Sequence, residues 1–170
     1  ELTYSQLCIV DLYSGRLISG VTPSVDTSIH LEIYKAVPEI KSIIHSHSKF
    51  ATSWAQALRP IPILGTTHAD YFLSDIPVAR QLEKYELDEY EKNLGQCVVD
   101  FYQTKKMNPL NIPAILLPGH GVMVFSDSPK RTLECAIVLE EIAEMAYYTT
   151  AINPNIQPCR LSRDLYIKHF

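Results

Sequence analysis

Apolar and polar positions along this chain follow two periods, which predict a mixture of strands and helices. Near the start, positions 6–13 alternate well enough for a strand, 14–15 is a turn signal, and 16–19 returns as a second strand. Turn and capping residues over 22–27 then precede apolar positions at helical spacing, and Pro38 ends that run. The pattern predicts a β-hairpin followed by a helix.

Short apolar runs predict three buried strands in the rest of the chain. The first closes at 43–44, and the other two cover 114–117 and 121–125. Between the first strand and the second, apolar positions at helical spacing predict a helix over 48–58. The same spacing predicts one or two helices over 78–105, which would cover one face of a sheet.

Glycine, proline and capping residues set the expected limits of the helices. Gly95 is expected to interrupt the helical region around it, and Asp127 or Ser128 is expected to cap a long helix with Pro129 in its first turn. A short helix is expected over 160–170. The buried stripe predicted for the long helix consists of Leu133, Ile137, Ile142 and Ala146.

The length and net charge of the chain, with its hydropathy, indicate which classes of protein and partner to expect. At 170 residues the chain is long enough for one domain with a substantial core. A net charge of −4, with no basic run longer than Lys105-Lys106, argues against a nucleic-acid partner. The longest apolar stretches are too short to span a membrane, and no signal peptide precedes the first strand, so a membrane partner is not expected.

Cysteine usage predicts a reducing compartment. The four cysteines lie far apart without CxxC spacing, and three of them stand in apolar periodic segments. Buried free thiols are therefore expected, which fits a cytoplasmic location. The four are Cys8, Cys97, Cys135 and Cys159.

Three histidines carry the candidate chemistry. His45 and His47 follow a buried strand at i and i+2, so their imidazoles point to the same face. A divalent metal site built on imidazole usually takes a third protein ligand and, if it is catalytic, keeps one position open. His120 is the candidate for the third ligand, because Gly119 and Gly121 on either side let the backbone approach closely.

Three segments with these histidines resemble the class II aldolase and epimerase family of phosphosugar enzymes. They are HSHSKFATSWAQA at 45–57, PILGTTHADYF at 62–72 and LLPGHG at 116–121. The resemblance runs from Leu2 to about His169, and GTTHADYF is similar to the epimerase branch rather than the aldolase branch. It implies one α/β domain over 1–170, with three α/β/α layers around a mixed, largely antiparallel sheet.

The resemblance also implies an activity and a cofactor. The activity is epimerisation of L-ribulose 5-phosphate at C4, giving D-xylulose 5-phosphate by cleavage and re-formation of the C3–C4 bond. The implied cofactor is Zn²⁺ on His45, His47 and His120, with Mn²⁺ or Co²⁺ also compatible with imidazole ligands. Two alternatives stay open: a class II aldolase that releases the two fragments, and a non-catalytic oligomeric relative.

Further site residues are implied by position. Ser24 and the backbone amide of Val25 stand where the family binds the substrate phosphate, and Asp26 matches an acidic residue near the metal. Simple N-capping would also explain Ser24 and Asp26. Asp70 is the implied acid/base carboxylate, although a solvated loop aspartate is the alternative. If 66–70 is extended, Asp70 shares a face with His68, to which the resemblance gives no metal role.

The resemblance also implies a substrate and an oligomeric state, and it bears on the two ends of the chain. It implies a phosphorylated pentulose substrate and a cyclic homotetramer with the active site between adjacent subunits. Two family segments are expected to be absent from the 170 residues. One is an N-terminal segment with an Asn near the metal and a Lys-Pro-Ser/Thr-Gly motif, and the other is a C-terminal tail with a catalytic Tyr.

Overall fold

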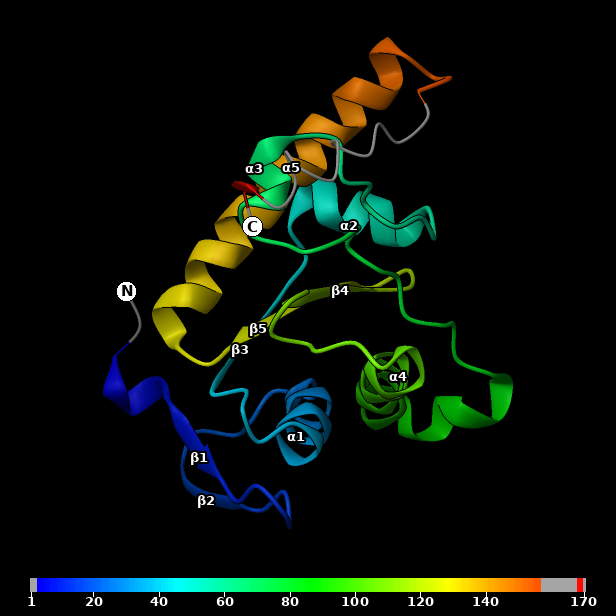
Figure 1. Cartoon of the computed structure of the whole chain (residues 1–170). Coiled ribbons are helices and arrows are strands. Elements are labelled where there is room, and N and C mark those ends of the chain that lie inside the picture. The colour runs from blue at the N-terminus through cyan, green and yellow to red at the C-terminus, as the bar shows by residue number, and fades with distance from the viewer. Residues whose placement is uncertain (1–2, 157–167, 170) are drawn as a thin grey trace.

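The computed structural model describes residues 3–156 and 168–169 (Figure 1). None of the helices in these ranges is both long and apolar enough to cross a membrane. In chain order the elements are the 3-10 helix η1 (Tyr4–Gln6), β1 (Cys8–Val10), β2 (Leu17–Gly20), α1 (Thr27–Ala36), β3 (Ser42–Ser46), α2 (Lys49–Gln56), α3 (Thr66–Ala69), the 3-10 helix η2 (Lys84–Glu89), α4 (Tyr90–Lys105), β4 (Ala114–Leu117), β5 (Gly121–Ser126) and α5 (Pro129–Ile152).

Three antiparallel strands form the centre of the molecule, in the order β3-β5-β4. Helices α1 and α4 cover one face of this sheet, and α2 and α5 cover the other (Figure 1). A parallel bridge between Val78 and Leu116 makes the pairing mixed. The predicted three-layer α/β/α architecture with a mixed, largely antiparallel sheet is confirmed.

Alternating side chains of β4 and β5 supply both cores. Leu116 and Val124 point to the α2–α5 side, whereas Ile115 and Phe125 point to the α1–α4 side. Every residue of β4 and β5 is buried, and apart from Ser126 at the end of β5 none has a polar side chain. The turn that joins the two strands is therefore held between two fully buried strands.

The predicted hairpin is present as the separate two-stranded sheet β1-β2, with Gly15 in its turn at φ +70°. Its residues are mostly exposed. Cys8 on β1 is also exposed, so the expectation of a buried thiol is wrong there, whereas Cys97 and Cys135 are buried free thiols. The hairpin strands alternate in sequence, but in the described part of the chain no helix covers them as the sheet's helices do.

Two local features differ from what the sequence pattern considered. An extended 66–70 would put His68 and Asp70 on one face, but residues 66–69 form the short helix α3, and the Phe72 amide donates to the His68 carbonyl to close the turn. The predicted interruption at Gly95 is wrong, because α4 continues through it. Gly95 lies where α4 meets α1, and a Cβ there would stand 2.9 Å from the Ile29 carbonyl oxygen. This glycine serves close helix packing.

Ser128 caps α5 as predicted, since its hydroxyl accepts from the Arg131 amide. Two members of the predicted buried stripe, Leu133 and Ile137, are more than half exposed, while Ile142 and Ala146 are buried. The buried face instead includes Cys135 and Leu139. Apolar residues occur around most of this helix, so their spacing does not identify the inner face. The predicted helix over 160–170 lies outside the described residues except at 168–169.

Replacing Gly95 by alanine should destabilise the protein. The added methyl group would meet the Ile29 carbonyl and the Glu32 Cβ, both at 2.9 Å, so α1 or α4 must shift. Overpacking of this kind costs about 1–3 kcal/mol, which outweighs the gain in helix propensity of up to about 1 kcal/mol. Urea titration measures the free energy of unfolding. Gln96→Ala, on the exposed side of the same turn, is the matched control. A Gly95→Ala protein as stable as the wild type would contradict this packing.

Candidate metal centre

Three imidazoles converge at one end of the sheet. His45 lies on β3, His47 follows it, and His120 lies in the β4–β5 turn. Their ring centroids are 4.8–5.0 Å apart, and the rings stand nearly perpendicular to one another. One potential ligand atom from each lies within 4.8 Å of the others. Among the described residues this is the one cluster of three or more potential metal ligands.

The spacing and donor set fit a divalent cation. The Nε2 atoms of His45 and His47 are 3.1 Å apart. Two imidazole nitrogens that share a tetrahedral zinc ion lie about 3.3 Å apart, because each Zn–N distance is about 2.0–2.1 Å. Three imidazoles leave a coordination position for a further ligand. The cluster could therefore hold a divalent metal with one position open.

Antiparallel pairing brings the three histidines together. Ser46 lies opposite Val122, so the last residues of β3 meet the first residues of β5, immediately after His120. Gly121 makes this approach possible. A Cβ on it would lie 2.6 Å from the Ser46 carbonyl oxygen and 2.8 Å from Cδ2 of His47. Gly119, at φ +66°, supplies the left-handed backbone conformation in the same turn.

Hydrogen bonds hold two of the rings from outside the cluster. Nδ1 of His45 lies 3.1 Å from the Val122 carbonyl oxygen, which can only accept, so Nδ1 carries the proton and Nε2 is free to bind a metal. Nδ1 of His120 lies 3.3 Å from the Tyr90 hydroxyl. Contacts of this kind usually orient metal-binding histidines.

Electrostatics favour neutral imidazoles. Burial lowers the pKa of His45, against the opposing effects of the Val122 carbonyl and the Asp26 carboxylate. Burial also lowers the pKa of His120, and the imidazoles of His45 and His47 lower it further. Near neutral pH these rings keep the lone pairs that a metal needs.

A cavity of about 910 Å³ borders the cluster between β1, α1 and β3. His45, Asp26 and Ser24 line it, so the structure brings the predicted phosphate-binding segment to the first histidine of the cluster. Asp26 stands at the N-cap of α1, but its side chain makes no capping hydrogen bond there. Its carboxylate instead accepts from the Ser24 hydroxyl at 3.3 Å. Capping of α1 by its side chain therefore does not explain why an aspartate stands at position 26.

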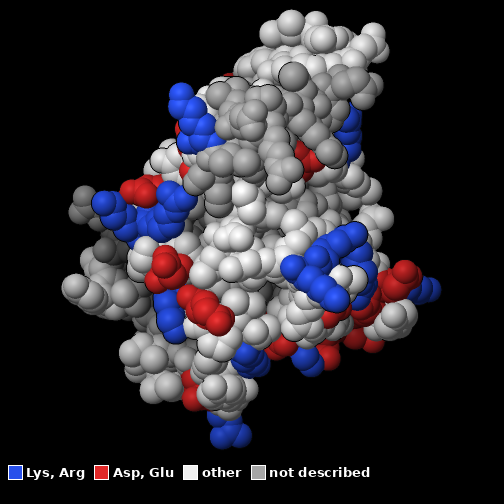
Figure 2. Space-filling view, viewed as in Figure 1, with Lys and Arg blue, Asp and Glu red and all other residues white. Residues whose placement is uncertain are grey.

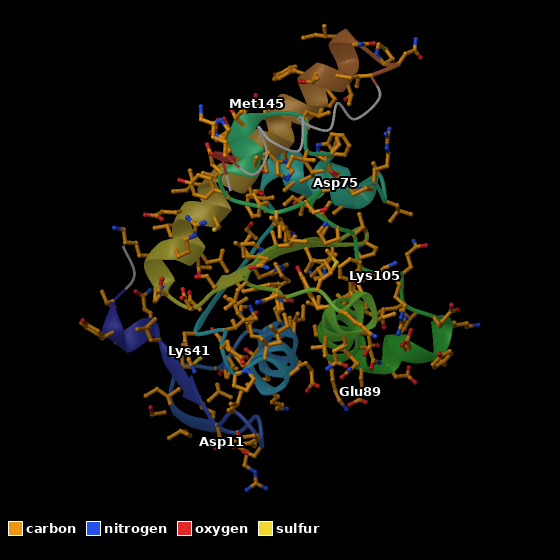
Figure 3. All side chains as sticks on the ribbon, in the orientation of Figure 1. Asp11, Lys41, Asp75, Glu89, Lys105 and Met145 are labelled. Carbon is orange, nitrogen blue, oxygen red and sulfur yellow. The ribbon has the colours of Figure 1, made fainter. Side chains whose placement is uncertain are left out.

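Two backbone amides at 24–26, those of Ser24 and Val25, donate no hydrogen bond within the described part of the chain. The Asp26 amide donates to the Ser24 hydroxyl, whereas the Val25 amide makes no hydrogen bond with the described part of the chain. Val25 is 74% exposed, so this amide can reach a ligand from solvent. Lys41, labelled in Figure 3, lines the same cavity where the chain enters β3.

Asp70 is not among the groups around the three histidines. It ends α3, which packs against α5 in the upper layer of Figure 1, and its carboxylate accepts from Nδ1 of His169 at 2.9 Å. The acidic side chains that act on the pKa of His120 are Asp26 and Glu91, not Asp70. His68 is buried, and Nε2 donates to the Ser74 carbonyl at 2.9 Å; burial lowers its pKa to about 4. It is a neutral core histidine.

Sequence reasoning missed two neighbours of the cluster. Tyr90 touches His120 from the start of α4, and its apolar helical spacing indicated only a core position. His30 lines the cavity beside His45 and Asp26, and burial lowers its pKa. Its position four residues after Asp26, about one helical turn, could have indicated that both face the same cavity.

Comparison with known families fits this geometry. Residues 1–147 match the family described as Class II Aldolase and Adducin N-terminal domain. The chain belongs to this family. The resemblance read from the three motifs is thus confirmed for the class II aldolase family as a whole. Its epimerase branch is not distinguished by this match.

Solved structures share the class II aldolase fold. One named L-fuculose 1-phosphate aldolase superposes with a TM-score of 0.79 at 21% identity, covering 99% of this chain and 72% of its own. YgbL from Klebsiella pneumoniae, described as a candidate aldolase/epimerase/decarboxylase, gives 0.68 at 25% identity, with 100% and 76% covered. An L-fuculose-1-phosphate aldolase from Thermus thermophilus gives 0.67 at 21%, with 92% and 75% covered.

Replacing Gly121 by alanine should impair metal binding. The methyl group would push the Ser46 backbone and the His47 ring outward, separating the ligands. Zinc affinity, measured by competition with a chelator, should fall by about tenfold or more, since ligand geometry sets affinity. Gly65→Ala is the matched control, because a Cβ at Gly65 meets nothing within 4 Å. Equal zinc affinity in both variants would show that Gly121 does not shape the site.

Proposed function

We propose that this class II aldolase family member is a metal-dependent epimerase, acting in the cytoplasm, that converts L-ribulose 5-phosphate to D-xylulose 5-phosphate. The observation that carries the proposal is the cluster of His45, His47 and His120 beside a cavity large enough for a sugar phosphate. Zn²⁺ is the proposed metal, and Mn²⁺ or Co²⁺ would also suit imidazole ligands. When bound, the metal supplies Lewis acidity that stabilises negative charge on substrate oxygens.

The position of C4 in the proposed substrate determines which reaction route is possible. C4 of L-ribulose 5-phosphate is not adjacent to the C2 carbonyl, so its proton is not acidic enough for direct removal. Removing the proton from the C4 hydroxyl instead lets the C3–C4 bond break, and its electron pair passes into an enediolate of dihydroxyacetone. Glycolaldehyde phosphate then rotates and re-adds through its other face. A proton returned to the C4 oxygen completes the inversion.

Three residues at the start of α1 would bind and orient the substrate. The Ser24 hydroxyl and the free amide of Val25 can donate to the phosphate, next to the positive end of the α1 dipole. Asp26 lines the same cavity as Ser24 and His45, where its carboxylate can accept from a substrate hydroxyl. With these assignments the phosphate would lie at the start of α1, and the reacting carbons would lie beside the histidines.

Asp70 is the proposed acid/base carboxylate, and it would act in a neighbouring subunit. It lies apart from its own chain's histidines, is 43% exposed, and is already in contact with His169. A cyclic homotetramer with active sites between subunits would bring Asp70 of one chain to the histidines of the next. The outer face of α5 offers apolar surface for such contacts, with Leu133, Ile137, Tyr148 and Ile152 all exposed.

The aldolase alternative needs the same histidines and the same bond cleavage. Solved structures with this fold carry the name L-fuculose 1-phosphate aldolase. The two activities differ in whether the aldehyde fragment is kept for re-addition or released. GTTHADYF and Asp26 favour the epimerase. A non-catalytic relative would have no need of a metal, so metal content separates that alternative from both enzymes.

The test is to incubate the zinc-loaded full-length protein with L-ribulose 5-phosphate and follow the products by NMR. Appearance of D-xylulose 5-phosphate is the expected result, and His45→Asn should lose zinc and turnover together. Accumulation of free dihydroxyacetone and glycolaldehyde phosphate would favour the aldolase. An untouched pentulose with zinc bound would refute this substrate, and a wild-type protein that binds no zinc would refute the metal centre.

Subunit mixing tests the role of Asp70. Asp70→Asn alone should bind zinc but turn over far more slowly, since general acid/base groups contribute about 10²–10⁴-fold. Co-expressing it with His45→Asn should restore activity, because about a quarter of the interfaces would then combine an intact histidine cluster with an intact Asp70. Activity that stays absent in the mixed oligomer would mean that both residues must come from one chain.

A further inference from the structure

Tyr90 is the side chain that supports the third histidine. Its hydroxyl oxygen lies 3.3 Å from Nδ1 of His120, and the two rings are nearly parallel, at 16°, with centroids 5.9 Å apart. The corresponding nitrogen of His45 is held by a backbone carbonyl. The hydrogen-bond partners of the two Nδ1 atoms therefore differ in kind. That of His45 is a backbone carbonyl, whereas that of His120 is a side chain from another element.

The direction of the Tyr90–His120 hydrogen bond follows from what a metal requires. A neutral imidazole carries one proton, and the nitrogen that binds a metal must be the unprotonated one. With Nδ1 facing Tyr90, Nε2 is the nitrogen left for the cluster. Nδ1 must then carry the proton and donate it to the phenol oxygen. If Tyr90 donated instead, the proton would sit on Nε2 and block metal binding.

We propose that Tyr90 is a positioning residue for the metal centre, which accepts a hydrogen bond from Nδ1–H of His120 and so holds the metal-binding tautomer. The inference rests on the proposed metal centre and adds a residue to it. Phenol oxygen is a neutral acceptor, so it fixes the ring without adding negative charge beside the cation. The near-parallel stacking limits rotation of the imidazole about its Cβ–Cγ bond.

Contacts outside the site hold Tyr90 in place. It is the first residue of α4, directly after η2. The Asn93 side-chain amide donates to the Glu86 carbonyl at 2.7 Å, and Arg80 binds the Glu86 carboxylate through two hydrogen bonds of 2.6 and 2.7 Å. The Asn93 contact joins η2 to the first turn of α4, and the Arg80 contact holds η2 against the segment that precedes it. The position of Tyr90 is thus supported by residues outside both the histidine cluster and the cavity.

Tyr90→Phe is the decisive substitution, because it removes the acceptor and keeps the stacked ring. Zinc affinity, measured by competition with a chelator of known affinity, should fall by about 10- to 100-fold, as expected when the outer partner of a metal-binding histidine is lost. Tyr85→Phe is the matched control, since Tyr85 lies in η2 and is 80% exposed. It should bind zinc as the wild type does. Equal affinity in all three proteins would overturn the proposal.

A second measurement does not depend on the variant folding. In the zinc-loaded wild type, nitrogen-15 NMR should show His120 with a proton on Nδ1 that exchanges slowly with water. A protonated Nε2 on His120, or a rapidly exchanging Nδ1 proton, would contradict the assignment. If the wild type binds no zinc, the proposed function itself fails. If it binds zinc but Tyr90→Phe binds equally well, only the role of Tyr90 fails.

Discussion

The pairing of β3 with β5 is the constraint on which the rest of the site depends. Side chains alternate across a strand, so a slip of one residue in this register would turn His45 to the opposite face. The register is enforced by burial, because β5 is buried along its whole length and places alternate residues in two different cores. Packing energy spread over the sheet thereby determines the position of three polar side chains at its end.

The helices on the two faces of the sheet contribute different kinds of residue. On one face, α1 and α4 position polar side chains near the histidines, since Asp26 precedes α1 and Tyr90 begins α4. On the other face, α2 and α5 supply most of the apolar core, and Trp54 of α2 donates its indole N–H to the Ala143 carbonyl of α5. Charged side chains of both signs are scattered over the surface seen in Figure 2. Asp26 and Tyr90, the neighbours of the three histidines named above, therefore both come from the α1–α4 layer.

The family resemblance of three motifs predicted the fold class, and simple patterns in the sequence predicted that His45, His47 and His120 would lie together, as they do. A period of two places His45 and His47 together, and flanking glycines mark His120. Tyr90 could not be predicted, because its contact requires α4 to dock against α1 through Gly95. The shared face considered for an extended 66–70 does not form, because residues 66–69 are helical and the Phe72 amide donates to the His68 carbonyl. Leu133 and Ile137 were misplaced because apolar residues surround most of α5.

The exposure of His47 would affect the order of folding and metal uptake at the proposed metal centre. His45 is already fixed by the Val122 carbonyl and His120 by Tyr90, whereas His47 is the exposed member of the three. If these histidines bind the proposed metal, two preformed ligands with one solvent-facing partner would let the incoming ion exchange its water molecules stepwise. Folding would then precede metal uptake, and little conformational entropy would be lost when the ion binds. A site of this kind can be emptied and refilled without unfolding the protein.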